Sequence, residues 1–318
     1  MTMPIPLSIP GALAQRYGRT RAGRNWLAGL PAVISEALER WEAAPDLPRG
    51  AEPWHGHGAL VLPVHSPRGP AVLKVAYPHE EALTEAPALA LWGGNGAVHL
   101  YASDASSGTL LLERLDHRRD LRSTDMETAV EAWGAVMRKI SLPVTESPLW
   151  AGIPPLAERV EQLSDELPAD WEELGRPFER TLLEAALEVC QTRGAVGRRS
   201  SNDVLVHTDL HFENILYRNG GSSAGQGFVA IDPQAMVGEA EFAVAPMLWN
   251  RMEELDQNRP QADLRRRLER LCSAAGLEYD VARQWSVLRE VENALDYIRN
   301  GQRADADRSV WVAAAVAG

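Results

Sequence analysis

Apolar residues in the first third of the chain follow first a helical and then a strand-like pattern. They recur at helical spacing over residues 26–41, which predicts an amphipathic helix. Two short runs rich in valine and leucine follow, at 59–65 and 71–77, and the Ser/Pro/Gly segment between them predicts a β-hairpin. Beyond the hairpin we expect one more helix and then two more strands, at 79–92, 97–102 and 109–112.

After about residue 120 the apolar pattern is mainly helical. Stripes with a period of 3.6 residues predict six helices, at 124–140, 155–167, 178–193, 242–255, 262–275 and 281–299. Three short β runs interrupt them, at 204–207, 215–217 and 228–231. The pattern therefore predicts an α+β protein with two lobes. A small β-rich lobe over residues 1–115 begins with a helical extension, and a larger, mainly helical lobe covers residues 116–318.

Composition and charge narrow the class of protein. The chain has 318 residues, 45% hydrophobic and 24% charged, which is typical of a soluble globular protein. Its net charge of −12 argues against sequence-independent binding to nucleic acid or to anionic membranes. No apolar run could span a bilayer, and residues 1–10 lack the basic start of a signal peptide. We therefore expect a cytoplasmic protein, with Cys190 and Cys272 as buried free thiols.

The β runs of the second half carry a constellation that suits phosphoryl transfer. His207, Asp209 and Asn214 form the pattern H-x-D-x-x-x-x-N, and Asp232 follows at the end of the next strand. Phosphoryl transfer needs a carboxylate at the acceptor hydroxyl, together with an amide and a second carboxylate as oxygen ligands for Mg²⁺. Asp209 and Asn214 share one loop and Asp232 comes from the adjacent strand, so all three can converge.

Such a reaction also needs a fixed cation for the phosphates of a nucleotide. Lysine occurs only at Lys74 and Lys139 among the 32 basic residues, and Lys74 lies in the middle of the second hairpin strand. An ammonium there needs a partner, for which we choose Glu85 on the following helix, with Glu81 in reserve. Pro87 should kink or delay that helix.

Two further segments lie where a nucleotide is expected to bind, although their residue types are not distinctive. Backbone groups near Glu113 and Leu115, where an apolar strand runs into the connector between the lobes, can hydrogen-bond an adenine edge. The segment Gly56-His57-Gly58 can cover phosphates, and it can equally be a simple turn.

Taken together, these motifs resemble the aminoglycoside phosphotransferase family of the protein-kinase-like fold. The likeness is greatest to its streptomycin 6-phosphotransferase and hydroxyurea phosphotransferase branch. It covers roughly residues 50–255, and the segments that carry it are 71–75, 205–216, 230–233, 237–239 and 244–250. Thr208, Glu213 and Gln234 depart from the family's usual residues without removing a catalytic group.

The resemblance implies a role for each residue of the constellation. Asp209 would be the catalytic carboxylate, Asn214 and Asp232 would hold Mg²⁺, and Lys74 and Glu85 would form the ion pair that orients the phosphates of ATP. His207 would support the loop. Residues 1–115 would then contain the nucleotide-binding lobe and residues 116–318 the catalytic and substrate-binding lobe.

The implied activity is transfer of the ATP γ-phosphate to a hydroxyl of a streptomycin-like aminoglycoside, which would confer resistance. Hydroxyurea or another small hydroxylated metabolite is the alternative acceptor. Two other classes stay open, namely a metal-dependent hydrolase built on His207, Asp209 and His211, and a non-catalytic binder with the kinase shape. The expected partners are a nucleotide and a small, cationic substrate, with no nucleic acid or membrane, and the chain is expected to be a monomer or weak dimer. Acidic residues after Asp232 can line a pocket for that cation or form a solvated helix face, namely Glu239, Glu241, Glu253, Glu254 and Asp256.

Overall fold

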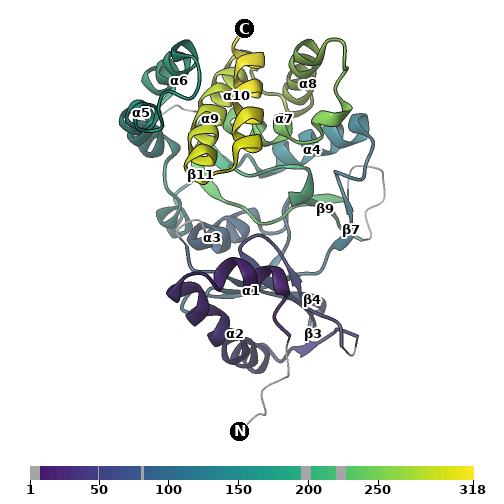
Figure 1. Ribbon diagram of the computed structural model, residues 1–318. Helices are drawn as coiled ribbons and strands as arrows, with labels where there is room; N and C mark the ends of the chain where they lie inside the picture. The colour runs from purple at the N-terminus through teal and green to yellow at the C-terminus, as the bar shows by residue number, and fades with distance from the viewer. Residues whose placement is uncertain (1–7, 49, 80–81, 195–201, 220–226) are drawn as a thin grey trace. The chain divides into compact units, whose positions relative to one another are not determined.

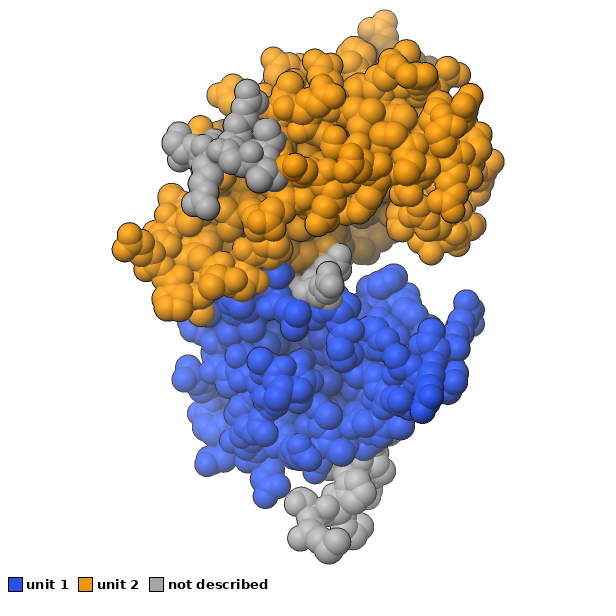
Figure 2. Space-filling view, turned by 90° about the vertical axis from the view of Figure 1, so that its left-hand side faces the viewer, with its two compact units in different colours: residues 1–115 blue, residues 116–318 orange. Residues whose placement is uncertain are grey.

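The computed structural model describes residues 8–48, 50–79, 82–194, 202–219 and 227–318. The chain divides into two compact units, residues 1–115 and residues 116–318, which Figure 2 shows in blue and orange. Each unit has its own elements and its own core, and each is described by itself.

Unit 1 is built on an antiparallel sheet. Its principal strands are ordered β1-β3-β4-β6-β5, and β2 pairs with β3 outside this path; β3 and β4 are labelled in Figure 1. These strands are β1 (Ala44–Pro45), β2 (Trp54–His55), β3 (Ala59–Ser66), β4 (Gly69–Ala76), β5 (Leu100–Asp104) and β6 (Thr109–Glu113). The helices of the unit are α1 (Gly11–Tyr17), α2 (Arg21–Arg40) and α3 (Ala82–Trp92). The predicted leading helix and the four predicted strands are confirmed, whereas α1, β1 and β2 were not predicted.

The predicted β-hairpin is confirmed as β3 and β4, joined by the two residues Pro67 and Arg68. Ser66 stabilises this turn, because its Oγ accepts from the Arg68 N–H at 3.2 Å and donates to the Gly69 carbonyl at 3.1 Å. Gly69 has a φ of 96°, in the left-handed region that glycine adopts without steric cost. The turn fixes the register of the strands, which places Val61 opposite Lys74.

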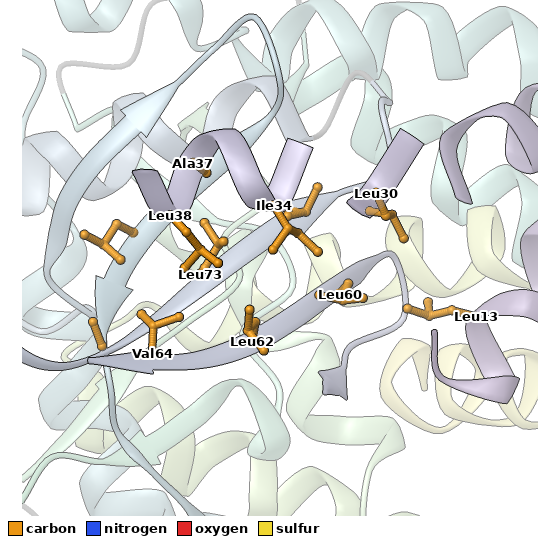
Figure 3. Packing of buried hydrophobic residues seen from close by; sticks show 12 residues of the cluster. Leu13, Leu30, Ile34, Ala37, Leu38, Leu60, Leu62, Val64 and Leu73 are labelled. Carbon is orange, nitrogen blue, oxygen red and sulfur yellow. The ribbon is translucent and has the colours of Figure 1, made fainter. Parts of the chain in front are cut away.

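The core of unit 1 lies between the sheet and the first two helices. On α2, Leu30, Ile34 and Leu38 recur every fourth residue and so share one face, which is buried. On β3, buried side chains at every second position, including Leu62, point toward that face (Figure 3). Burying one such side chain stabilises the fold by about 1.5–3 kcal/mol. The amphipathic helix predicted at the start of the chain therefore serves to cover one face of the sheet.

The helix predicted over 79–92 is described as α3, and Pro87 lies inside it. Glu85 and Leu89 are on its buried face, whereas Leu83 is 69% exposed and does not contribute to the core as the apolar pattern indicated. Residues 80 and 81 lie outside the described residues, so the reserve partner Glu81 cannot be compared with Glu85.

Unit 2 is mainly helical. Five of its six predicted helices are confirmed, as α4 (Met126–Ile140), α5 (Leu156–Glu173), α6 (Arg180–Arg193), α8 (Pro260–Ala275) and α9 (Tyr279–Arg299). A further helix, α10 (Arg303–Ala317), was not predicted and packs alongside α9 (Figure 1). Cys190 and Cys272 are buried free thiols, as expected.

The helix predicted over 242–255 is wrong, because the segment is broken into short pieces. These are the 3-10 turns 240–244 and 252–254 on either side of α7 (Pro246–Trp249). Arg251 is buried with a φ of 54°, which no α-helix allows. Its guanidinium donates to the carbonyls of Leu121 at 3.0 Å and Thr124 at 2.8 Å, and Arg267 donates to the Asn250 carbonyl at 2.7 Å. Hydrogen bonds to distant residues thus replace those of a continuous helix.

Two short antiparallel sheets interrupt the helices of unit 2. One has the order β10-β9-β7, with β7 (Asp116–Asp120), β9 (Ile215–Tyr217) and β10 (Phe228–Ala230). The other pairs β8 (Val204–His207) with β11 (Ala235–Gly238). The three predicted β runs are confirmed, and β7 and β11 were not predicted. Among the described residues, no helix is both long and apolar enough to cross a membrane.

Candidate active site

In unit 1, Lys74 forms a buried ion pair with Glu85. Lys74 Nζ lies 2.7 Å from both carboxylate oxygens of Glu85, and the two side chains are only 9% and 4% exposed. Lys74 comes from the middle of β4, and Glu85 comes from the face of α3 that turns inward. Burying either charge alone would be costly, so the pair fixes both side chains in one geometry.

The end of β6 and the residues after it contain Glu113 and Leu115, the positions predicted to bind an adenine edge. The Glu113 N–H donates to the His99 carbonyl at 2.9 Å, and the Glu113 carboxylate accepts from the His99 N–H at 3.2 Å. Leu115, at the end of the unit, is 8% exposed, and its N–H donates to no group in the described part of the chain. This N–H is therefore available to donate to a ligand.

The segment Gly56-His57-Gly58 is the turn between β2 and β3. The Gly56 N–H donates to the Ala59 carbonyl at 3.0 Å, and the Tyr77 N–H donates to the Gly58 carbonyl at 2.8 Å. From α1, the Arg16 guanidinium donates to the carbonyl of His57. The contacts are those of an ordered turn, and a role in covering phosphates stays a prediction.

In unit 2, residues 208–214, between β8 and β9, form a loop that we call the Asp209 loop. Asp209 is partly exposed, and the Asn214 side-chain amide donates to the Asp209 carbonyl at 2.9 Å and to its carboxylate at 3.3 Å. Since the Asn214 N–H₂ group is used in this way, its amide oxygen is the atom left for a cation. Asp209 and Asn214 therefore lie together, as their spacing in the sequence predicted.

His207 supports this loop from beneath. It is fully buried, its Nε2 donates to the Ile231 carbonyl at 2.9 Å, and its Nδ1 accepts from the Asp209 N–H at 3.2 Å. One neutral tautomer satisfies both contacts, because a carbonyl only accepts and an N–H only donates. Burial lowers the pKa of His207, which agrees with a neutral ring. His207 thus has no ring nitrogen left for a metal ion.

Asp232 is brought toward the Asp209 loop by the neighbouring strand. The Ile231 N–H donates to the Asn214 carbonyl at 2.9 Å, which continues the pairing of β10 with β9. Asp232 follows with an exposed side chain and a φ of 55°. Aspartate tolerates this left-handed conformation better than most residues, and the conformation turns the chain sharply after the strand. The hydrogen bond of Ile231 therefore connects the residue next to Asp232 to Asn214 in the Asp209 loop.

Four hydrogen bonds that the sequence did not reveal hold the backbone of the loop. The Thr208 N–H and Oγ1 donate to the Gln234 carbonyl at 2.9 and 2.8 Å, and Arg289 Nη1 donates to the Thr208 carbonyl at 2.8 Å. From α4, Trp133 Nε1 donates to the Leu210 carbonyl at 3.2 Å. Trp133 is fully buried, so the same side chain fills the core and holds the loop. Nothing in the sequence distinguishes Arg289 from the other arginines.

The acidic residues that follow Asp232 are mostly engaged in structural contacts. Glu239 accepts from Trp285 Nε1 at 2.8 Å and pairs with Arg193 at 3.4 Å, and Glu254 pairs with Arg251 at 2.7 Å. Glu241 accepts from the Glu278 N–H at 3.2 Å, and Glu253 and Asp256 are exposed. These contacts favour a structural or solvated role over an acidic lining for a cationic substrate.

The described residues fit a magnesium site better than a zinc site. Within them, no group of three or more His, Cys, Asp and Glu side chains is placed to hold a metal ion. This finding argues against the hypothesis of a metal-dependent hydrolase, in which His207, Asp209 and His211 would bind the metal ion. Both ring nitrogens of His207 already form hydrogen bonds, which argues against that hypothesis as well. The amide oxygen of Asn214 and the carboxylate of Asp232 are hard oxygen donors, of the kind that Mg²⁺ prefers.

Comparison with known sequences identifies similar proteins along almost the whole chain. The sequence model of a family described as aminoglycoside/hydroxyurea antibiotic resistance kinase matches residues 40–301. The streptomycin 6-kinase of Streptomyces griseus is 33% identical, with 98% of this chain and 97% of that protein covered. The hydroxyurea phosphotransferase of Kitasatospora aureofaciens is also 33% identical, with 98% of this chain and 86% of that protein covered.

Solved structures show the same fold at much lower identity. Aminoglycoside phosphotransferase APH(4)-Ia matches with a TM-score of 0.59 and 14% identity, over 90% of this chain and 97% of that one. Choline kinase LicA from Streptococcus pneumoniae matches with a TM-score of 0.56 and 12% identity, over 90% of this chain and 99% of that one. The expected protein-kinase-like fold, with one sheet-rich and one mainly helical part, is therefore confirmed.

Proposed function

The chain belongs to the aminoglycoside/hydroxyurea antibiotic resistance kinase family, and on that premise we propose that it transfers the γ-phosphate of ATP to a hydroxyl of a streptomycin-like aminoglycoside. Its similarity to the streptomycin 6-kinases of two Streptomyces species, along nearly the full length of each, supports this choice of acceptor. A solved relative of the same fold was crystallised with ADP and hygromycin B, which supports a nucleotide and an aminoglycoside as the two substrates. Phosphorylation of the antibiotic would inactivate it.

The observation that carries the proposal is the Asp209 loop itself. Asp209 is the carboxylate that orients the acceptor hydroxyl and takes its proton, and Asn214 fixes Asp209 through its side-chain amide. Asn214 and Asp232 would hold Mg²⁺, which when bound neutralises charge on the phosphate oxygens. His207 stays neutral and maintains the loop.

In unit 1, the same proposal assigns nucleotide binding to Lys74, Glu85, Glu113 and Leu115. Lys74 binds the α- and β-phosphates, and its pairing with Glu85 keeps the ammonium in a single position. The N–H of Leu115, which donates to no group among the described residues, and a backbone group near Glu113 bind the adenine edge. With this division of roles, the protein would act in the cytoplasm on small molecules, as a monomer or weak dimer without nucleic-acid or membrane partners.

A direct test is to incubate the protein with Mg-ATP and a panel of acceptors that contains streptomycin, hygromycin B and hydroxyurea. We expect mass spectrometry to detect streptomycin carrying one added phosphate. Asp209→Asn should reduce the rate by about 100- to 10,000-fold, because it removes the general base. Asp165→Asn, at an exposed aspartate on α5, is the matched control and should leave the rate unchanged. Full activity in Asp209→Asn would refute the role of Asp209.

A second acceptor is supported by the hydroxyurea phosphotransferase, which is as similar in identity as the streptomycin kinases. Phosphorylation of hydroxyurea but not of any aminoglycoside on the panel would support this alternative. ATP binding without transfer to any acceptor would instead support the non-catalytic binder.

A further inference from the structure

We propose that Arg289 is a positioning residue for the Asp209 loop, fixing the peptide bond that precedes the catalytic carboxylate. This inference rests on the proposed function, because it takes Asp209 as the catalytic residue. Arg289 lies on α9, and its Nη1 donates to the Thr208 carbonyl at 2.8 Å across 81 residues of sequence. That carbonyl belongs to the peptide group that joins Thr208 to Asp209.

All three polar groups of Thr208 are held, and Arg289 supplies the contact to one of them. The N–H and the hydroxyl both donate to the Gln234 carbonyl, so this side of Thr208 is tied to the segment that carries Asp232. Only Arg289 engages the carbonyl, among the described residues, and Thr208 is 6% exposed. Without Arg289, the carbonyl would have to rotate toward water or remain unsatisfied, and either change disturbs the Asp209 backbone.

The Arg289 side chain contacts the Asp209 loop and the ring of Phe242. Within the described part of the chain, the Thr208 carbonyl is the acceptor of its single hydrogen bond, and no carboxylate forms an ion pair with it. Its guanidinium carbon lies 4.9 Å from the centre of the Phe242 ring, which holds the planar group in place. An arginine suits this place because one flat group can stack on a ring and donate at its edge.

The same helix offers a matched control in Arg283. Its guanidinium also donates to backbone carbonyls, those of Val316 and Ala317 at 3.5 and 3.3 Å, and its Nε lies 3.6 Å from Asp280. Substitution of Arg283 removes an arginine from α9 in the same way, at a site that does not touch the Asp209 loop.

Kinetics with ATP and the acceptor that the wild type phosphorylates test the proposal. We expect Arg289→Met to lower kcat by about 10- to 100-fold, because small displacements of a catalytic group have effects of this size. The KM for ATP should stay within about twofold, since the lost contact orients a catalytic group and does not bind nucleotide. Arg289→Lys should lose less than Arg289→Met, and Arg283→Met should retain the wild-type kcat. An unchanged kcat in Arg289→Met, or an equal loss in Arg283→Met, would overturn the proposal.

Hydrogen exchange supplies a second readout that does not need activity. Peptides covering residues 205–212 should exchange at least about tenfold faster in Arg289→Met than in wild type or Arg283→Met. Unchanged exchange there would refute the positioning role. If the wild type phosphorylates no acceptor, the proposed function fails, and the exchange result still decides whether Arg289 holds the loop.

Discussion

Glu290 should make the stability of unit 2 fall as the pH rises toward neutrality. This residue of α9 is fully buried, its Oε1 accepts from Asn293 Nδ2 at 3.1 Å, and its Oε2 has no hydrogen-bond partner within the described structure. Burial raises the pKa of Glu290 from 4.5 to about 7, and nearby Ser309, Arg289 and Arg308 offset only part of the effect. The folded protein therefore holds a proton on Glu290 that the unfolded chain releases at lower pH.

The size of the effect follows from the two pKa values. Below pH 4.5 the carboxyl is protonated in both states, so its ionisation does not change the free energy of unfolding. Between pH 4.5 and about 7 the unfolded chain ionises while the folded chain does not, so stability falls with rising pH. At about 1.4 kcal/mol per pH unit, the loss from this group reaches about 3 kcal/mol and then levels off.

Glu290→Gln isolates this contribution because glutamine has the same shape and cannot ionise. We expect denaturant unfolding at several pH values between 4 and 8 to show that the stability of the variant, relative to that of the wild type, increases by about 3 kcal/mol over the range. Glu269→Gln, at an exposed glutamate of α8, is the control and should follow the wild type in parallel. A difference between Glu290→Gln and wild type that stays constant with pH would refute the reasoning.

Two further predictions concern the packing of each unit. Lys74→Met and Glu85→Gln should each destabilise unit 1 by about 3–5 kcal/mol, because each leaves one buried charge without its partner. The combination Lys74→Met with Glu85→Gln should cost less than the sum of the two single changes in a double-mutant cycle, and strict additivity would contradict the pairing. In unit 2, a Cβ at Gly134 would lie 2.6 Å from the backbone carbonyl of Ala274, so Gly134→Ala should cost about 1–3 kcal/mol in denaturant unfolding. Gly29→Ala is its control, since a Cβ at this helical glycine meets nothing within 4 Å, and an equal loss there would show that the close contact is not the cause.

Sequence patterns predicted the parts of this protein that depend on local chemistry. The hairpin of β3 and β4 followed from alternating apolar residues around a Ser/Pro/Gly turn, and its register then brought Lys74 opposite Val61. The spacing from Asp209 to Asn214 was informative because both residues belong to one short loop. In each case the decisive contacts lie within a few residues, where a single sequence is most informative.

Features that depend on distant partners could not be predicted in this way. The stripe over 242–255 had a helical period, yet carbonyls near residues 121 and 124 hold Arg251 in a conformation that interrupts the helix. The contact of Arg289 with Thr208 left no trace in the pattern, because arginine is common on exposed helix faces in this chain. Helix α10 was missed since its apolar segment, over 310–317, is short and rich in alanine.

The long-range contacts of the Asp209 loop have a consequence for the order of folding. Trp133 precedes its partner Leu210 by 77 residues, whereas Arg289 follows Thr208 by 81. During synthesis, the loop and its tryptophan partner leave the ribosome well before α9 has been made. Contacts that are distant in sequence form late, because a long chain segment must first be closed. We therefore expect nascent chains that end before α9 to contain every residue of the phosphoryl-transfer constellation and still to lack its final geometry.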